Sequence, residues 1–468
     1  MEDIPQGHKV ALKEMCEGEA VIKYGSPIGH AVCSCPAGAW LNEHNVETNL
    51  SGLLSYKYHP VQFPSPLRSH DDHYNNLFPS PGTFMGYRRR NGLVGIRNET
   101  WIIPTVGCVN GIVRELASRM RAEYHTDEVL AFTHDYGCSQ LGEDHLHTKK
   151  ILRGMVRHPN AGAVLVVGLG CENNQVDQFR QFCGDVDPDR VKFVTVQEVQ
   201  GNETDYCMSL LRELYDRTQS DVRSECPLSE LTIGLKCGGS DGFSGITANP
   251  LLGVFSDYVV AQGGRSILTE VPEMFGAETL LMARCRDRHV FDKVVALIND
   301  FKAYYLSHGQ PVGENPSPGN KAGGISTLEE KALGCTQKSG SSPVNAVIAY
   351  GDAISEPGLS LLYAPGNDLV ASTALAAAGC QIVLFSTGRG TPFGTFVPTM
   401  KISTNTLLAE KKPNWIDFDA GTLIEGTDME TLARAFADHV IRIANGEPTR
   451  NEQNGYRDMA IFKTGVTL

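Results

Sequence analysis

Short apolar runs alternate with longer, amphipathic stretches along most of the chain, from about Gly86 onward. An apolar run followed by a helix-like stretch, repeated, is typical of a parallel sheet covered by helices on both faces. In a first unit we expect strands over 100–106, 129–133, 163–169 and 192–196, with a helix over 111–124. In a second unit we expect strands over 231–235, 266–269, 344–348 and 381–386, with a helix over 278–306. The sequence therefore predicts an α/β protein with two parallel-sheet units.

Residues 9–50 follow a different pattern. Their apolar segments are only a few residues long and are separated by Gly and Pro, which is typical of a small all-β module. A polar stretch rich in Pro follows, and its lack of apolar periodicity predicts a linker. The predicted organisation is a β module over 1–58, a linker over 59–85, a middle α/β domain over 86–226 and a C-terminal α/β domain over 227–468.

Polar, glycine-rich clusters follow the apolar strands at several places. In parallel sheets, ligands bind outside the carboxyl ends of the strands, where such loops converge. Glycine lets the backbone approach a ligand closely, and the N-terminus of the helix that follows favours an anion. Each cluster taken alone is also compatible with an ordinary turn. Their repetition predicts a site for a small carboxylate.

Four cysteines end predicted strands: Cys108, Cys138, Cys171 and Cys237. Thiolates suit iron, as a single ion or as an iron-sulfur cluster. The sequence has no Cys-x-x-Cys pair, and a free cysteine is often only a small buried apolar residue. Both interpretations stay open for each of the four cysteines.

Oxygen and nitrogen donors supply further candidates for ligands and for proton transfer: His134, Glu172, Ser240, Asp241, Thr247, Asn249, Glu270 and Glu273. Lys321 and Arg389 are single cations within glycine loops, and the planar Arg fork grips a carboxylate through two hydrogen bonds. The spacing of a P-loop is missing around Lys321, and Gly168-x-Gly170 lacks the third glycine of a dinucleotide fingerprint. A nucleotide cofactor is therefore disfavoured.

The composition narrows the classes of function. Hydrophobic residues make up 41% and charged residues 20% of the chain, as in folded globular proteins. A net charge of −13 argues against nucleic acid as a partner, because a phosphate-binding surface needs clustered Lys and Arg. No apolar run approaches the roughly eighteen residues that a membrane helix needs. Thirteen cysteines and an acidic, polar N-terminus predict reduced thiols and a cytoplasmic location.

Several longer motifs occur along the chain, among them Pro104-Thr105-Val106-Gly107-Cys108, Tyr136-Gly137-Cys138-Ser139-Gln140-Leu141-Gly142, Gly170-Cys171-Glu172-Asn173-Asn174, Cys237-Gly238-Gly239-Ser240-Asp241, Asn315-Pro316-Ser317-Pro318-Gly319-Asn320-Lys321 and Thr387-Gly388-Arg389-Gly390. With these motifs the chain resembles the altronate dehydratase family, whose wider group includes galactarate dehydratases. The run from Cys138 to Gly142 and the C-terminal segment are similar to the altronate branch.

The resemblance implies a fold and a function. The fold is a β-clip (SAF-like) module, partial here, a middle domain that helps to form a homodimer, and a Rossmann-like C-terminal domain with a metal site. The function is that of a hydro-lyase that converts D-altronate to 2-keto-3-deoxy-D-gluconate and water in hexuronate (galacturonate) catabolism. Galactarate or another related hydroxy acid is the alternative substrate. The implied cofactor is Fe²⁺, with Mn²⁺ or an iron-sulfur cluster as alternatives.

Under this hypothesis the candidate residues receive roles. The expected metal ligands are Cys138, Cys171, Cys237 and Asp241. The expected catalytic residues are His134, Glu270, Lys321 and Arg389. The expected substrate contacts are Ser240, Thr247, Asn249, Asn320 and Arg389. A carbohydrate-binding or assembly protein that has lost catalysis is the alternative from another class, and the intact metal-type residues count against it.

Overall fold

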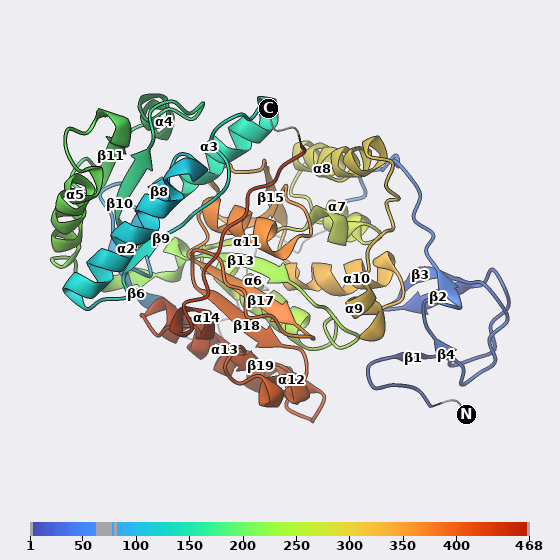
Figure 1. Ribbon diagram of the computed structural model, residues 1–468. Coiled ribbons are helices and arrows are strands. Elements are labelled where there is room, and N and C mark those ends of the chain that lie inside the picture. The colour runs from blue at the N-terminus through green and yellow to red at the C-terminus, as the bar shows by residue number, and fades with distance from the viewer. Residues whose placement is uncertain (1–2, 62–76, 79–81, 466–468) are drawn as a thin grey trace.

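The computed structural model describes residues 3–61, 77–78 and 82–465. The chain folds into three parts, and the C-terminal unit lies between the N-terminal module and the middle unit (Figure 1). The expected α/β class with a small N-terminal β module is confirmed. Much of the expected linker, residues 62–76 and 79–81, lies outside the described residues. Within the described ranges, no helix is both long enough and apolar enough to cross a bilayer.

The N-terminal module consists of short antiparallel strands. β1 (Lys9–Val10) pairs with β4 (Trp40–Leu41). A three-stranded sheet is formed by β2 (Ala20–Lys23), β3 (Ser26–Ala31) and β5 (Val46–Glu47). Apolar side chains of the module, including Val21 and Ile28, pack in one cluster with Ala332 and Leu333 of the C-terminal unit. Because so small a module buries little apolar surface by itself, this docking supplies much of its core.

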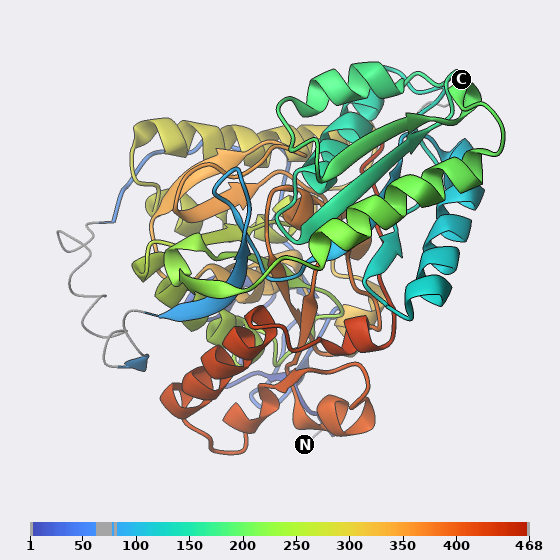
Figure 2. The same cartoon turned by 90° about the vertical axis from the view of Figure 1, so that its left-hand side faces the viewer.

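The middle unit is a four-stranded parallel sheet in the order β11-β10-β8-β9. Its strands are β8 (Glu99–Pro104), β9 (Val129–Ala131), β10 (Ala161–Gly168) and β11 (Val191–Thr195). Its helices are α2 (Asn110–Tyr124), α3 (Gly142–Val156), α4 (Val176–Cys183) and α5 (Glu203–Thr218). Side chains of α2 and α5 share one core and those of α3 and α4 another, so the sheet lies between helices (Figure 2). β10 is therefore buried along its whole length.

The chain enters and leaves the middle unit through one antiparallel sheet. In that sheet β6 (Thr83–Arg88) pairs with both β12 (Ser224–Pro227) and β7 (Val94–Gly95). Phe84 is buried while its neighbours Thr83 and Met85 are exposed, as expected for a strand with one covered face. Residues 83–85, which we expected in the linker, thus belong to this sheet.

The C-terminal unit has a seven-stranded parallel sheet in the order β15-β16-β14-β13-β17-β18-β19. Its strands are β13 (Thr232–Cys237), β14 (Arg265–Leu268), β15 (Val344–Ile348), β16 (Gly358–Leu362), β17 (Ile382–Thr387), β18 (Thr399–Ser403) and β19 (Phe418–Asp419). β13 has β14 on one side and β17 on the other. Where crossovers leave a strand in opposite directions, the loops that follow the strands separate and leave room for a ligand. The carboxyl end of β13 is therefore the place to look for a site.

Helices cover both faces of this sheet. They are α6 (Ala248–Ala261), α7 (Glu278–Ala283), α8 (Arg288–Ser307), α9 (Pro318–Ala322), α10 (Leu328–Cys335), α11 (Asp368–Ala377), α12 (Thr406–Lys411), α13 (Met429–Ala444) and α14 (Arg450–Gln453). Side chains of α6, α8 and α13 belong to the main apolar core of the unit, and those of α11 to the core that it shares with the middle unit.

The single helix expected over 278–306 is wrong, because the chain forms two helices, α7 and α8, there. Between them, Cys285 makes an isolated bridge with Val344. The Asp287 side chain then caps α8 by accepting a hydrogen bond from the Val290 backbone N–H at 2.8 Å. The apolar periodicity continues across the boundary between α7 and α8. In the sequence, only the capping residue Asp287 indicates that a new helix begins there.

The middle and C-terminal units join where α3 packs on α11. The two helices approach most closely at Gly154, where a Cβ would lie 2.4 Å from the carbonyl oxygen of Ala377. The C-terminal segment around Phe462 packs against the same junction. Phe462 is buried, and its backbone N–H donates to the Tyr350 hydroxyl at 2.8 Å.

Replacing Gly154 by Ala tests this junction. The added methyl group has to push α3 away from a backbone atom, so we expect a loss of roughly 1–3 kcal/mol in the free energy of unfolding. The matched control is Gly111→Ala in α2, because a Cβ at Gly111 would meet nothing within 4 Å. Alanine is the better helix former, so the control should be neutral or stabilising. Thermal unfolding midpoints of both variants check this, and equal midpoints would contradict it.

Candidate active site

The carboxyl end of β13 lies against a buried group of charged side chains and thiols, which we call the Lys–Glu–Cys cluster. Its members come from five elements that are distant in sequence: Lys236 and Cys237 in β13, Glu270 and Glu273 after β14, Lys331 and Cys335 in α10, Lys338 in the 3-10 turn Thr336–Ser339, and Asp368 in α11. All of them except Asp368 are buried.

Lys236 organises one half of the cluster. Its ammonium group contacts Glu270, and neither side chain has exposed surface. It also donates to Asp368 Oδ1 at 2.8 Å. Burial lowers the pKa of Lys236, but Asp368 and Glu270 outweigh this effect, so the pKa is raised and the side chain stays charged. Glu270 adopts a left-handed backbone conformation (φ +68°), which a residue with a side chain adopts only when its contacts hold it there.

The two thiols form the other half of the cluster. The Sγ atoms of Cys237 and Cys335 lie 3.3 Å apart, and they lie 3.1 Å and 3.2 Å from Glu273 Oε2. Lys338 Nζ lies 2.7 Å from the Cys237 sulfur. Burial raises the pKa of Glu273, but the ammonium groups of Lys331, Lys236 and Lys338 outweigh it and lower the pKa to about 2. The hydrogen bond with Cys237, together with burial, holds the pKa of Cys335 well above its ordinary value.

Cys237, Glu273 and Cys335 are the one group of His, Cys, Asp or Glu side chains, among the described residues, whose donor atoms lie within 4.8 Å of one another. Their surroundings do not fit a divalent cation. Three lysine ammonium groups already balance the carboxylates of Glu270, Glu273 and Asp368. A divalent cation would be balanced here only if Cys237 and Cys335 both lost their protons, and the hydrogen bond with Cys237 together with burial raises the pKa of Cys335 and disfavours its thiolate.

A narrow cavity opens beside the cluster. Its lining includes Ser240, Asn249, Lys331, Cys335 and, from the N-terminal module, Tyr24. The Ser240 hydroxyl is buried and has no hydrogen-bond partner among the described residues. An unpaired buried hydroxyl costs free energy, so a polar ligand that pairs with it gains affinity. The cavity has a volume of only about 10 Å³, room for one water-sized group, so it can take one polar end of a small acid while the rest of the acid lies outside it.

A second cavity, of about 440 Å³, lies on the other side of Asp241, which lines both. The Asp241 carboxylate accepts hydrogen bonds from Thr404 Oγ1 at 2.9 Å, Ser244 Oγ at 3.0 Å and Asn405 Nδ2 at 3.1 Å, and burial raises its pKa. Arg389 lines the second cavity, is exposed, and has no ion pair among the residues that the structure describes. It is free to bind a carboxylate.

The other residues expected to bind substrate mainly build the loops around the two cavities. Thr247 donates to backbone carbonyls of Phe243 and Thr404, and Asn320 Nδ2 donates to the Ser240 carbonyl at 2.9 Å. Asn249 lines the first cavity and is held by Ser386, whose hydroxyl donates to it at 2.6 Å. Lys321 is partly exposed.

His134, Cys138 and Cys171 lie at the carboxyl ends of strands in the other sheet, that of the middle unit, so the structure does not bring them together with Cys237 and Asp241. Both ring nitrogens of His134 face backbone groups: Nε2 lies 2.9 Å from the Pro104 carbonyl, and Nδ1 lies 3.1 Å from the Tyr136 N–H. Burial lowers the pKa of His134 to about 4. Its observed contacts position the loop after β9.

Sequence reasoning missed Lys236, Lys331, Cys335 and Lys338. Two signals were present. Lys236 interrupts an otherwise apolar strand immediately before Cys237. Lys331 and Cys335 are four residues apart in α10, a spacing that places two side chains on the same face of a helix.

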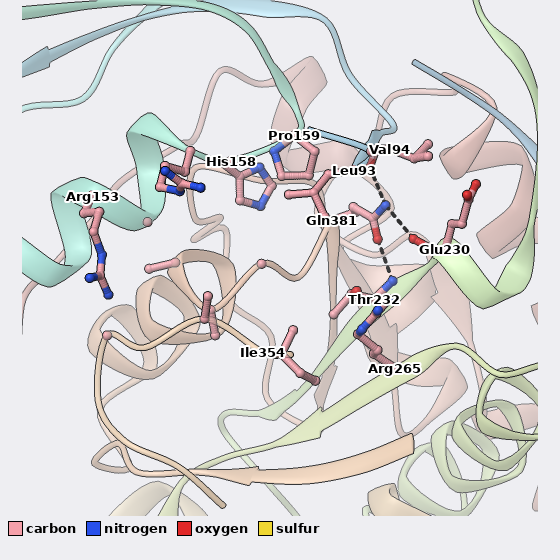
Figure 3. A pocket seen from close by; sticks show the side chains of 18 of the residues that line it. Leu93, Val94, Arg153, His158, Pro159, Glu230, Thr232, Arg265, Ile354 and Gln381 are labelled. Carbon is pink, nitrogen blue, oxygen red and sulfur yellow. Dashed lines mark hydrogen bonds between the residues drawn. The ribbon is translucent and has the colours of Figure 1, made fainter. Parts of the chain in front are cut away.

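A cavity of about 570 Å³ lies at the opposite, amino ends of the strands, between the middle and C-terminal units (Figure 3). Its cations are already engaged: Arg157 donates to the Cys183 carbonyl at 2.7 Å, and Arg153 lies 3.6 Å from Asp352. Gln381 accepts a hydrogen bond from the Thr232 N–H at 2.5 Å and donates to the Glu230 carbonyl at 3.1 Å, as Figure 3 shows. Gln381 also donates to the Val94 carbonyl at 2.5 Å, and this bond and the Arg153–Asp352 pair join the two units. No member of the Lys–Glu–Cys cluster lines this cavity.

Comparison with known proteins gives the family. Three family models match: the altronate/galactarate dehydratase SAF domain over residues 1–49, the second domain of D-galactarate dehydratase/altronate hydrolase over 86–219, and the C-terminal domain of D-galactarate/altronate dehydratase over 228–467. The chain belongs to this dehydratase family. The resemblance stated from the sequence motifs is thereby confirmed.

Individual relatives in the family include altronate dehydratases from Escherichia coli and Bacillus subtilis. Each is 56% identical to this chain over all of it and over 93% of the relative. A galactarate dehydratase (L-threo-forming) from Escherichia coli is 32% identical over 99% of this chain and 90% of the relative. The family match thus includes the SAF module, which also lines the candidate substrate cavity through Tyr24.

Glu330 in α10 anchors that module to the C-terminal unit. Its carboxylate lies 2.8 Å from Lys9 Nζ and 2.8 Å from Lys23 Nζ, and its side chain is 2% exposed. Burial raises the pKa of Glu330, but Lys9 and Lys23 outweigh it, and the pKa is lowered. The stabilisation is therefore complete above the ordinary carboxyl pKa and is lost as the pH falls through the lowered value of the folded protein.

Glu330→Gln should release the SAF module. Removing one partner of a buried ion pair leaves the other charge buried, and we expect a cost of roughly 3–5 kcal/mol. The control is Glu19→Gln, which removes the exposed pair with Lys13 and should leave the stability almost unchanged. Limited proteolysis of residues 3–50 at neutral pH measures the difference. Equal protection in both variants would contradict this role of Glu330.

Proposed function

We propose that this chain is an altronate dehydratase, a hydro-lyase that removes water from D-altronate and gives 2-keto-3-deoxy-D-gluconate. The identity of 56% with two altronate dehydratases over the whole chain supports this substrate. The observation that carries the proposal is the unpaired Ser240 hydroxyl in a cavity whose wall includes Lys331 and Cys335 of the Lys–Glu–Cys cluster.

The reaction has two difficult steps. The proton on C2 of a 2,3-dihydroxy acid is only weakly acidic, and hydroxide is a poor leaving group. A site therefore has to stabilise the negative charge that develops next to the carboxylate, and it has to deliver a proton to the departing 3-hydroxyl group. The enol that forms then tautomerises to the 2-keto-3-deoxy acid.

Lys331 is placed to stabilise the developing charge. It lines the substrate cavity, and its Nζ lies 2.7 Å from Glu273 Oε1. Burial lowers the pKa of Lys331, but Glu273 outweighs it and raises the pKa, so the side chain is an ammonium group at neutral pH. A fixed cation in a buried site interacts strongly with charge that appears only in the transition state.

Cys335 is placed to donate a proton to the departing 3-hydroxyl group. It lines the same cavity, and its raised pKa keeps the thiol protonated at neutral pH. Its sulfur is hydrogen-bonded to Glu273, which also contacts Cys237, and Cys237 in turn contacts Lys338. Cys335 gives its proton to the departing 3-hydroxyl group, which leaves as water, and the thiolate that remains takes the proton from C2, so the thiol is restored and the protons balance. Glu273 and Lys338 act here as positioning residues.

The expected iron, or manganese, does not fit the Lys–Glu–Cys cluster because of its three ammonium groups, and we assign no step to a metal there. The expected roles of Glu270 and Asp241 change accordingly. Glu270 neutralises Lys236, and Asp241 braces the loop between the two cavities.

Galactarate is the second candidate substrate, and Arg389 is the observation that favours it. Galactarate has a carboxylate at each end, and Arg389 is an unpaired cation in the neighbouring cavity, beyond Asp241. The chain is 32% identical to a galactarate dehydratase but 56% identical to two altronate dehydratases, and this difference favours altronate as the substrate.

Turnover of the two acids by anaerobically purified protein, with ferrous iron and a reductant present, distinguishes these substrates. We expect the keto-deoxy acid to form from D-altronate, with kcat/KM for altronate exceeding that for galactarate by about 10-fold or more, the discrimination that one differing substituent typically gives. Faster turnover of galactarate would reverse the assignment, and turnover of neither would refute the proposed activity.

Ser240→Ala tests the substrate cavity. Loss of one hydrogen bond to a charged or hydroxyl group of the substrate should lower kcat/KM by about 10- to 100-fold. The control is Ser372→Ala in α11, because the Ser372 hydroxyl is also buried and unpaired among the described residues but lines none of the cavities discussed above. Both variants should fold normally. Equal kcat/KM values for the two variants would remove Ser240 from the substrate site.

We further propose that the protein acts in the cytoplasm as a homodimer. All thirteen cysteines are free, which fits a reducing compartment. The homodimer rests on the family resemblance alone. Light scattering of the purified protein checks it.

A further inference from the structure

Three exposed cysteines lie together at one edge of the middle unit. Cys108 follows β8, Cys138 follows β9 and Cys171 follows β10, and β8 lies between the other two strands in the sheet. Since the strands are parallel, their carboxyl ends share an edge. Cys237, the fourth cysteine at a strand end, is buried in the other sheet.

Hydrogen bonds join the three loops. The Gly107 N–H donates to the Tyr136 carbonyl at 2.8 Å, which ties the Cys108 loop to the Cys138 loop. The Ser139 N–H donates to Asn173 Oδ1 at 2.7 Å, which ties the Cys138 loop to the Cys171 loop. Gly137 is pressed against the Cys108 loop, because a Cβ there would lie 2.1 Å from the Thr105 carbonyl oxygen.

The three sulfurs have only weak, neutral neighbours. Ser139 Oγ lies 3.9 Å from the Cys138 sulfur, and Gln197 Nε2 lies 3.8 Å from the Cys171 sulfur. The nearby carboxylate of Glu172 is buried and accepts from Thr105 Oγ1 at 2.7 Å and from the Leu169 N–H at 3.0 Å. In contrast to Cys237, these thiols have no lysine in hydrogen-bond contact among the described residues. No ammonium group next to the sulfurs would therefore repel a metal cation.

The three sulfurs are too far apart to share a single metal ion. A single tetrahedral ion with metal–sulfur bonds of about 2.3 Å holds its thiolates less than about 4 Å apart. Among the described residues, Cys108, Cys138 and Cys171 do not form a group whose sulfurs all lie within 4.8 Å of one another. In an iron-sulfur cluster each thiolate binds a different iron, so the cluster spans a wider gap.

Two buried amide oxygens in the same loops also lack a partner. Asn110 Oδ1 and Asn174 Oδ1 accept no hydrogen bond among the described residues, although the side chains are only 8% and 1% exposed. Each residue follows one of the cysteines by two or three positions. Unpaired buried acceptors of this kind indicate a missing donor, such as the hydroxyl group of a ligand.

We propose that Cys108, Cys138 and Cys171 bind a [4Fe–4S] cluster. Three thiolates leave one iron without a protein ligand, and its open position suits an oxygen donor such as a hydroxy acid. The proposal does not rest on the dehydratase activity, because its site and its test involve neither Ser240 nor the Lys–Glu–Cys cluster.

The test uses the full chain, purified without oxygen and reconstituted with ferrous iron and sulfide. We expect about four iron and four sulfide per chain, with the broad visible absorption of a cluster. One-electron oxidation by ferricyanide should then release one Fe²⁺ and leave a [3Fe–4S]⁺ cluster with its own electron paramagnetic resonance signal. That release is typical of a cluster with one iron that no thiolate holds.

Three variants, Cys108→Ser, Cys138→Ser and Cys171→Ser, identify the ligands. Each should lose most of the bound sulfide and of the visible absorption. Cys33→Ser is the control, because Cys33 is likewise exposed but lies in the N-terminal module. Circular dichroism checks that all four variants fold. Iron without sulfide in the parent protein, or sulfide retained by the three variants at the level of the control, would overturn the proposal.

Discussion

The buried contact between Lys236 and Glu270 is the constraint on which the candidate active site depends. Neither side chain has exposed surface, and a charge in such a place is tolerated only when it is paired. The carboxylate of Glu270 also reaches Lys338 and the backbone N–H of Cys237, and the ammonium group of Lys236 reaches Asp368. One pair thus holds the ends of β13 and β14, the turn after α10 and the start of α11 in fixed positions.

Around this pair, each structural unit contributes to the substrate cavity or supports it. The SAF module supplies Tyr24 and is held by Glu330, which belongs to α10, the helix that carries Lys331 and Cys335. The middle unit supports the C-terminal sheet from the other end, through the contact at Gly154 and the hydrogen bond from Gln381 Nε2 to the Val94 carbonyl. The family match over all three parts agrees with this interdependence.

The two parallel sheets offer different chemistry at their carboxyl edges. At β13 the thiols are buried among ammonium groups, so proton transfer and anion binding suit this edge better than a metal ion. At β8, β9 and β10 the thiols are exposed and, among the described residues, no lysine lies in hydrogen-bond contact with them, which is the chemistry on which the proposed cluster rests. The difference comes from the residues next to the cysteines, because the strand-end positions themselves are equivalent.

The sequence by itself determined the α/β class, the N-terminal β module, the strands of the middle sheet, four of the seven strands of the C-terminal sheet and the family, because apolar runs and glycine motifs are local features. It missed β16, β18 and β19. It also predicted functional roles for Ser240 and Asp241, which stay predictions. Only the tertiary structure decided that Cys237 belongs with Glu273 and Cys335 while Cys138 and Cys171 belong to another edge, and that Lys236, Lys331 and Lys338 surround the first group. Strand order, the break between α7 and α8, and the meeting of charges from five elements depend on contacts between residues far apart in sequence, which no local pattern encodes.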